Sequence, residues 1–461
     1  MDGTTRLSRA AAIVLLSWSP MNLTSQGTWN PTVTTGGPAG RFGHSATYNL
    51  AHDKTVLFGG LDTAYTTNAE TWEFDGLQWH AVTTAAVPSA RCAHTLAYDF
   101  LRDRVVLFGG TNSAFLAVGL DDTWEFDGVQ WQQALPAHIP PGRFNHAMTY
   151  DLGSGCALVH GGRSVGSSLL GDTWGWNGVD WVLLAANGPS ARYHHAMCFD
   201  LQRSRSVLFG GRDTMDLADT WEWDGTQWLP PTTGGPTPRN GHALVYDLAR
   251  AVTVLHGGSQ GGDETWEWDG NHWALVASGA TLRRDHAMVF DARLQRATLF
   301  GGVLCTAFAV FSDVMNYDTP LPGSFQSVGA SCAGATGTPL LAPSTASLGG
   351  PALGSTSILE VSPVAGETFL LFGLSHTYDG SLPLPHDLTP LGMNGCTLQV
   401  SRDAVTSAPS LAGTASFGLA VPNDPFLTSF SFYVQAFPLD LAANALGFTS
   451  TNTLIATVGR N

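Results

Sequence analysis

The sequence predicts an all-β protein: a six-bladed β-propeller closed by an N-terminal strand, followed by an antiparallel β-sandwich domain. Two observations lead to this prediction. A segment of about 50 residues recurs six times, and the composition changes abruptly after Asp318. Each copy contains Arg-x-x-His and then an apolar stretch that ends in Gly-Gly. A repeat of this length that holds four short strands is typical of a propeller blade.

Each copy predicts four strands. The segment after the histidine is short and apolar, and the segment before Gly-Gly is rich in β-branched residues, as in residues 105–108. Residues 124–126 alternate apolar and polar side chains, as a half-buried strand does. The Asp-Gly pair that follows in most copies indicates a hairpin, because both central residues of a type I′ turn have positive φ. Trp131 then lies on the fourth strand.

The sixth copy lacks its fourth strand. Residues 313–317 replace the acid-Thr-Trp segment, but no tryptophan strand follows them. Trp29 precedes Arg41 by the same twelve residues that separate Trp79 from Arg91. We therefore expect the segment around Trp29 to be the outer strand of blade six. Pairing of the two chain ends closes the ring and leaves no open sheet edge.

An arginine, a histidine and an acid recur in every copy. The Arg/His pairs are Arg41/His44, Arg91/His94, Arg143/His146, Arg192/His195, Arg239/His242 and Arg283/His286. The acids are Glu70, Asp122, Asp172, Asp219, Glu264 and Asp313. A ring of guanidinium groups can hold an anion, and a ring of imidazoles can hold a metal. A residue needed in all six blades is better explained by folding, so we expect Arg–acid pairs, histidines bonded to backbone, no metal and no cofactor.

The glycine doublet, the trailing Asp-Gly and the last-strand tryptophan resemble the kelch repeat over residues 27–318. The copies depart from one another at Gly175 and Asn177 in blade three, and at His160 and His256, which replace phenylalanine. The resemblance implies a galactose-oxidase-like six-bladed propeller. Kelch-type propellers carry unlike functions, so the resemblance alone does not decide the activity.

The chain divides by composition into four segments. Residues 1–25 are predicted to be a secretory signal, because Arg6 and Arg9 precede an apolar stretch at 10–18. This apolar stretch is too short to span a membrane. The propeller takes residues 26–318, a proline-containing linker takes 319–324, and the β-sandwich takes 325–461. We therefore expect a secreted, periplasmic or cell-envelope protein without an integral membrane segment.

The last domain resembles a C-terminal module of secreted bacterial proteins, on residues 331–334, 382–385, 391–396 and 422–424. Cys332 and Cys396 lie in glycine-flanked turns and would form a disulfide in an oxidising compartment. The other cysteines occupy unrelated repeat positions, and we expect them to be free and mostly buried. They are Cys92, Cys156, Cys198 and Cys305.

The charge balance excludes one class of partner. The formal net charge is −16, and Lys54 is the only lysine. Without a basic patch the chain has nothing to neutralise phosphates, so nucleic acid is not an expected partner. The same balance disfavours docking to an anionic membrane surface.

The connections after Gly-Gly vary in length and content, and varied loops on a repeated frame are the expected binding surface. The candidate binding residues on that face are those that break the repeat: Tyr65, Asn145, Arg163, Tyr193, His194, Arg212, Asp213, Asp216, Arg284 and Asp285. The tryptophans recur at fixed positions, which favours packing between blades over sugar stacking. They are Trp72, Trp124, Trp174, Trp221, Trp266 and the Trp29/Trp79 series.

Two classes of function remain. The first is a non-catalytic binding protein with a glycan or protein partner, the glycan being slightly preferred. The second is an enzyme, since the chain also resembles six-bladed sialic acid mutarotases, which transfer protons on an acidic sugar. A histidine can act as the acid or base in such a transfer. The variable loops hold no non-repeat glutamate for the same role, which weakens this alternative. Copper oxidase chemistry of the galactose oxidase kind is not expected, because tyrosines such as Tyr48 and Tyr98 are repeat positions.

Overall fold

The structure is a computed structural model that describes residues 27–319, except 35, 115–117, 261, 279–280, 305 and 307, and the strands beyond 319 together with Thr451. The chain divides into two compact units, Met1–Asp318 and Thr319–Asn461. The predicted signal (1–25) and the cysteines Cys305, Cys332 and Cys396 lie outside the described residues. In the described part of the chain, no helix is both long and apolar enough to cross a bilayer.

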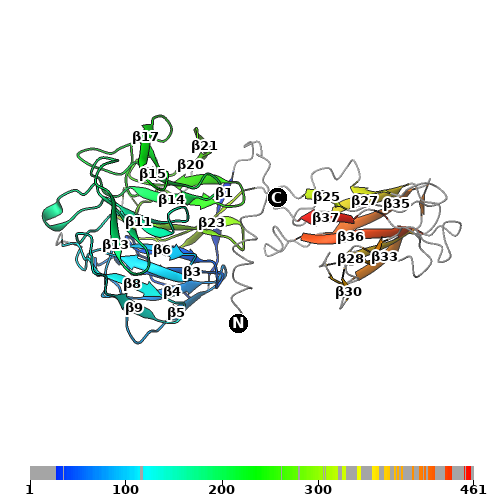
Figure 1. The fold of residues 1–461 in the computed structure, drawn as a ribbon, viewed down its shortest axis with the longest axis horizontal. Helices are drawn as coiled ribbons and strands as arrows, with labels where there is room; N and C mark the ends of the chain where they lie inside the picture. Colours follow the sequence, from blue (N-terminus) through cyan, green and yellow to red (C-terminus); the bar gives the residue numbers. More distant parts are fainter. Residues whose placement is uncertain are drawn as a thin grey trace. The chain divides into compact units, whose positions relative to one another are not determined.

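The first unit is a propeller of six four-stranded antiparallel sheets, as predicted (Figure 1). The inner strands are β2 (Ser45–Asn49), β6 (Thr95–Asp99), β10 (Ala147–Asp151), β14 (Ala196–Asp200), β18 (Ala243–Asp247) and β22 (Ala287–Asp291). The second strands are β3 (Lys54–Phe58), β7 (Arg104–Phe108), β11 (Cys156–His160), β15 (Arg205–Phe209), β19 (Val252–His256) and β23 (Arg296–Phe300).

The third strands are β4 (Thr71–Phe74), β8 (Thr123–Phe126), β12 (Thr173–Trp176), β16 (Thr220–Trp223), β20 (Thr265–Trp268) and β24 (Val314–Asp318). The outer strands are β5 (Trp79–Val82), β9 (Trp131–Ala134), β13 (Trp181–Ala185), β17 (Trp228–Thr232), β21 (Trp273–Ala277) and β1 (Thr28–Thr32). The loop after β11 contains one 3-10 turn, η1 (Val165–Ser167).

The second strand of each blade is buried on both faces. In β3, for example, Val56, Leu57 and Phe58 are completely shielded from solvent. Each blade packs between two neighbours, so both faces of this strand meet apolar side chains. That position explains why the sequence before Gly-Gly is continuously apolar instead of alternating.

The ring closes through the N-terminal strand, as predicted. Strand β1 pairs antiparallel with β24, so that Trp29 lies opposite Tyr317. The Trp29 indole donates a hydrogen bond to Thr265 Oγ1 of blade five at 2.8 Å. Blade six therefore contains both ends of the propeller sequence, and its outer strand is supplied by residues some 285 positions upstream of β24.

The last-strand tryptophans join neighbouring blades. In five of the six blades this residue, like Trp29, donates its indole N–H to the threonine at the start of the third strand in the preceding blade. The other bonds of this kind are Trp131–Thr71, Trp181–Thr123 and Trp228–Thr173, each at 2.9 Å, and Trp273–Thr220 at 2.8 Å. In blade six Val314 takes the threonine position, and Trp79 packs in the same apolar cluster as Val314.

The second unit contains two larger antiparallel sheets. One has the order β25 (Ser324–Val328), β37 (Thr453–Thr457), β36 (Ser431–Pro438), β28 (Thr368–Gly373) and β33 (Ala404–Ala408). The other has the order β26 (Leu340–Pro343), β27 (Thr356–Ser362), β35 (Thr414–Ala420) and β34 (Ser410–Leu411). Two short pairs are β29 (Tyr378–Asp379) with β30 (Leu382–Pro383), and β31 (His386–Asp387) with β32 (Thr397–Leu398). The packing of these sheets into a sandwich stays a prediction.

Candidate binding site at the mouth of the central channel

The loops of each blade lie on two opposite faces of the propeller. The connection from the second to the third strand and the Arg-x-x-His turn before the inner strand lie on one face, which we call the loop face. The hairpins after the inner strand and after the third strand lie on the other face. This division follows from the antiparallel strand order within every blade.

A closed ring of six backbone hydrogen bonds surrounds the axis on the loop face. The second variable residue of each Arg-x-x-His turn donates its N–H to the carbonyl of the same position in the preceding blade. The bonds are Ala93–Gly43, Asn145–Ala93, His194–Asn145, Gly241–His194, Asp285–Gly241 and Gly43–Asp285, at 2.7 to 2.9 Å. The ring links all six blades directly and defines the mouth of the central channel.

The backbone conformation at this ring limits which residues can occupy it. All six positions have φ between 54° and 68°, which is the left-handed region. Glycine enters this region freely, and asparagine, aspartate and histidine are enriched there among the other residues. The conformation thus explains the residue types, but it does not explain which of the six blades carry a polar side chain.

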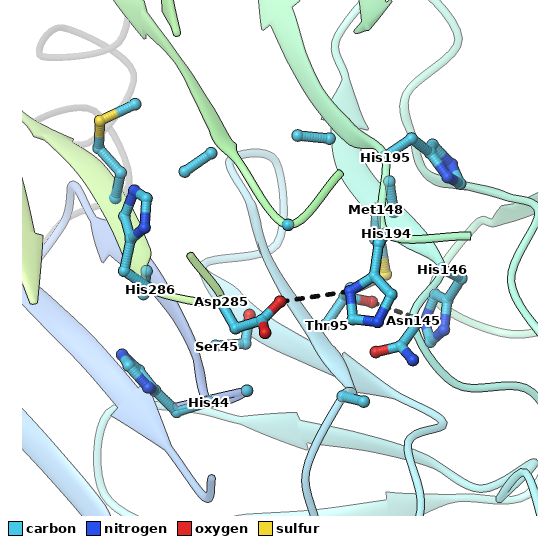
Figure 2. A pocket seen from close by; sticks show the side chains of 18 of the residues that line it. His44, Ser45, Thr95, Asn145, His146, Met148, His194, His195, Asp285 and His286 are labelled. Carbon is cyan, nitrogen blue, oxygen red and sulfur yellow. Dashed lines mark hydrogen bonds and ion pairs between the residues drawn. The ribbon is translucent and has the colours of Figure 1, made fainter. Parts of the chain in front are cut away.

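The channel mouth opens into a cavity of ≈ 190 Å³, lined by the ring residues, the six repeated histidines and the first residues of the inner strands. Gly43, Ala93 and Gly241 leave space at the ring, whereas Asn145, His194 and Asp285 place polar groups on it. In Figure 2 the side chains of His194 and Asp285 point toward one another, and Asn145 lies beside His194. These three side chains come from blades three, four and six.

His194 and Asp285 form the polar centre of the mouth. The His194 Nδ1 atom lies 3.3 Å from Asp285 Oδ1, and the side chains are 24% and 11% exposed. Burial opposes ionisation of Asp285, but the neighbouring His194 and then Arg284 outweigh it and hold its pKa below the usual range. Arg284 Nη1 lies 3.6 Å from the other carboxylate oxygen. The carboxylate is therefore charged at neutral pH and reachable from the mouth.

The repeated histidines are packed between neighbouring blades. Each imidazole meets the aromatic residue before Gly-Gly of the preceding blade edge-on, as His94 meets Phe58 with ring centroids 5.4 Å apart. Burial, followed by the nearby arginine, lowers the pKa of His146 and His242 to about 3, so both are neutral. The expected bond to backbone is formed by His242, which donates to Phe209 O at 3.1 Å.

Equivalent backbone hydrogen bonds, to Phe300, Phe58 and Phe108, act on the pKa of His44, His94 and His146. His146 Nε2 also lies 2.7 Å from Thr95 Oγ1. His195 and His286 differ from the expectation, because both of their ring nitrogens lack a hydrogen-bond partner. The reason is geometric: these rings are held by edge-on aromatic contact, and in blades three and five the aromatic partner is itself a histidine, His160 or His256.

The repeated arginines are occupied by the fold. Each is at most 2% exposed and forms an ion pair with the acid of its own blade. The pairs are Arg41–Glu70 (2.5 Å), Arg91–Asp122 (2.7 Å), Arg143–Asp172 (2.9 Å), Arg192–Asp219 (2.7 Å), Arg239–Glu264 (2.6 Å) and Arg283–Asp313 (2.8 Å). The same acids accept the indole N–H of the third-strand tryptophans, as Asp122 does from Trp124 at 2.8 Å. The third-strand tryptophans thus anchor their own blade in addition to packing.

A second, wider ring surrounds the mouth. The first variable residue of each Arg-x-x-His turn bridges to the residue after Gly-Gly, as Tyr193 does to Arg212 and Phe144 to Arg163. The Arg163 guanidinium stacks on the Tyr193 ring at 3.9 Å. Within the described residues Arg163 has no acidic partner, and its buried Nε has no acceptor. The Tyr193 ring in turn lies 5.2 Å from His194.

Three predicted residues lie elsewhere on the loop face. Arg212 pairs with Asp216 at 3.1 Å, and Asp216 also accepts from Asn240 and Ser259 at 2.8 and 2.9 Å. Arg212 and Asp216 border a separate hollow of ≈ 640 Å³ between blades four and five. Asp213 accepts the Met215 N–H at 3.0 Å and so forms the turn of its own loop.

Tyr65 belongs to an aromatic group that the sequence did not single out. Its ring lies 5.3 Å from Phe308 and 6.1 Å from Phe42. Phe42 occupies the same repeat position as Tyr193, and the residue at this position varies between copies. Variation between copies is the criterion that selected Tyr193, so it also applies to Phe42. Phe308 lies in a variable loop that was expected to bind, and only its exposure in the folded protein distinguishes it.

The described residues contain no cluster of three or more histidine, cysteine or acidic side chains that could hold a metal ion. Cys92, Cys156 and Cys198 are free and buried. Burial, helped by Asp285, raises the pKa of Cys92 to about 12, so this thiol near the mouth is unreactive at neutral pH.

Comparison with known proteins agrees with the repeat. Residues 20–182 match the family model described as the KLHDC2/KLHL20/DRC7 Kelch-repeats domain. This match spans roughly the first three blades and agrees with the kelch resemblance of the repeat. One similar solved structure, titled "Structure of YjhT", has 16% sequence identity and a TM-score of 0.48, and the match covers 62% of this chain and 95% of that chain. No curated protein matches the chain.

Proposed function

We propose that this kelch-repeat protein is a secreted or envelope-associated binding protein that holds a glycan or a protein at the channel mouth without catalysing a reaction. One observation carries the proposal. The arginines and acids that the blades share are paired with one another, whereas the repeat-breaking Asn145, His194 and Asp285 meet at an open cavity. Varied side chains gathered on a rigid frame are the usual arrangement of a binding site.

The mouth offers complementary hydrogen-bonding groups. Asp285 supplies a charged acceptor, His194 a ring nitrogen, and Asn145 both a donor and an acceptor. Because the ring of backbone bonds fixes all three positions, little conformational entropy is lost when a ligand binds. A polyhydroxylated sugar suits such a set, and this favours a glycan over a protein partner.

The test compares two mouth variants with one control. Asp285→Asn keeps the size and a residue type that favours the left-handed conformation, and His194→Gln removes the imidazole; His272→Gln makes the same chemical change at an exposed position of the opposite face. Binding of the full chain to a glycan array and to solubilised envelope proteins is measured together with thermal melting. We expect binding to fall about 10- to 150-fold in the mouth variants, as for a lost charge-assisted hydrogen bond. Unchanged binding in both variants would refute the proposed site.

A second candidate is a sugar-converting enzyme of the mutarotase kind, and the His194–Asp285 pair favours it. A carboxylate that orients an imidazole at the rim of a cavity is suited to proton transfer. Arg212, which was expected to share this role, lies in the other hollow and is paired with Asp216. Anomer exchange of free sugars, sialic acid included, is measured by NMR; a rate equal in wild type and His194→Gln would exclude this candidate.

A further inference from the structure

Three aromatic side chains from blades one and six form a group on the loop face, which we call the aromatic platform: Phe42, Tyr65 and Phe308. The Tyr65 and Phe308 rings lie 5.3 Å apart at 39°, and both lie about 6 Å from Phe42 in edge-on orientation. Phe308 is 51% exposed and Tyr65 is half-buried. Contiguous apolar patches of a few hundred Å² on a protein surface are often functional.

The backbone holds two of these rings in place at an energetic cost. Tyr65 has φ of 60° and Phe308 has φ of 53°, in the left-handed region that bulky side chains rarely adopt. The Tyr65 loop is fixed by Asp62, whose Oδ1 accepts the N–H groups of Ala64 and Thr66 at 2.8 and 2.9 Å. Strain that persists because the surroundings enforce it is concentrated at ligand-binding positions.

The aromatic platform is joined to the channel mouth through the backbone, and its rings lie outside the lining of the mouth cavity. Phe42 is followed by Gly43, whose N–H donates to Asp285 O at 2.9 Å. The loop that carries Phe308 begins at Val303, which bridges to Arg284, the residue before Asp285. The backbone segments that carry the rings and Asp285 thus meet at the seam between blades six and one.

The size of the aromatic platform selects its occupant. An aromatic side chain has about 150–250 Å² of surface that burial can cover. Because each of the three side chains is about half-exposed at most, together they present at most roughly 300 Å² of aromatic surface. A stable protein interface buries about 800 Å² on each partner, which is well beyond this area. The apolar C–H face of one sugar ring matches it, because C–H groups are attracted to the negative face of an aromatic ring.

We propose that Phe42, Tyr65 and Phe308 are a stacking site for one pyranose ring of a glycan, whose hydroxyl groups reach Asp285 at the channel mouth. This inference rests on the proposed binding function and names its ligand class and its contact residues. The polar mouth orients the sugar through hydrogen bonds, and the platform supplies apolar contact on the adjacent side.

The test uses saturation-transfer NMR and titration of the full chain with methyl glycosides of glucose, galactose, mannose and N-acetylglucosamine. Tyr65→Gly and Phe308→Gly remove a ring and also release the left-handed strain, and thermal melting of each variant separates loss of binding from unfolding. Each change is expected to lower the affinity about 2- to 12-fold. Tyr65→Phe keeps the ring and is expected to bind as wild type does. Phe100→Ala, which removes an exposed ring on the opposite face, is the matched control.

The outcomes separate this inference from the proposed function. If a glycoside binds and Asp285→Asn weakens it while both glycine variants bind as wild type, the stacking site is wrong and the binding function stands. If no glycoside binds wild type and the glycan array is also silent, the inference and the glycan form of the proposed function both fail. If only a protein partner covers the rings, the inference is overturned in favour of a protein interface.

Discussion

Acidification is expected to unfold the propeller through its buried histidines. The pKa of His44, His146, His160, His242 and His256 is lowered to about 3, chiefly by burial. Burial also lowers the pKa of His94, His195 and His286 well below the usual value. The unfolded chain takes up protons at these imidazoles below pH about 6.5, whereas the folded chain does not. The free energy of unfolding therefore falls as the pH drops from 6.5 toward 3.

The size of this fall in the free energy of unfolding follows from the coupling between proton binding and unfolding. Each such histidine lowers the free energy of unfolding by about 1.4 kcal/mol per pH unit in this window. The six repeated histidines together with His160 and His256 amount to a slope of about 11 kcal/mol per unit, which is comparable with the whole stability of a typical domain, about 5–15 kcal/mol. Carboxylates whose pKa lies below the usual range, such as Asp122, lose their contribution only at lower pH. The propeller is thus expected to unfold near pH 5.5.

Urea unfolding at pH 8.0, 7.0, 6.5 and 6.0, above the pH of the expected unfolding, measures how the slope approaches this value. Tryptophan fluorescence reports on the propeller and not on residues 319–461, which contain no tryptophan. His160→Phe, which restores the residue of most other blades, is expected to reduce the slope by about 1.4 kcal/mol per unit. His272→Gln, at an exposed position, is expected to leave it unchanged. A wild-type slope below about 2 kcal/mol per unit would show that the histidines are charged or hydrated in the folded state, and would refute their packing as neutral rings between blades.

Two further predictions concern the contacts between blades. Thr123→Val removes the acceptor of the buried Trp181 indole and is expected to lower the free energy of unfolding by about 1–3 kcal/mol. Thr123→Ser keeps the hydroxyl and is expected to lower it less. Equal losses of the two variants in urea unfolding would contradict the role of this hydrogen bond. A chain that lacks residues 1–33 loses β1 and leaves the β24 edge unpaired, so size-exclusion chromatography is expected to show oligomers or aggregates. A monomer with wild-type melting would show that β1 is dispensable.

Much of the fold could be predicted because the same sequence signals for strands and turns recur in the successive copies of the repeat. The Gly-Gly doublets, the Asp-Gly turns and the fixed tryptophans mark strand ends locally, and the missing strand after Tyr317 pointed to Trp29 by spacing alone. The ion-pair partners of the arginines followed from the same register. Periodicity was informative here because every copy folds in the same environment, so a shared residue marks a shared contact.

The candidate site was less predictable. Departures from the repeat singled out Asn145, His194 and Asp285, but they did not separate these from Arg212, which lies in a different hollow. Distances across the channel depend on the angular order of blades, and linear spacing does not show that His194 and Asp285 face one another over Gly241. The histidines were also expected to bond to backbone, as His242 does, whereas His195 and His286 each face another histidine, His160 or His256.

The sequence by itself determined the all-β class, the six blades, the closure by the N-terminal strand and the face that carries the variable loops. These are properties of a local, repeated pattern, and they need no knowledge of what lies across the ring. Only the tertiary structure decided which variable side chains meet. The ring of left-handed residues at the channel mouth and the platform of Phe42, Tyr65 and Phe308 bring together residues from blades that are distant in sequence. Such contacts arise from closure of the propeller, which places blade six beside blade one.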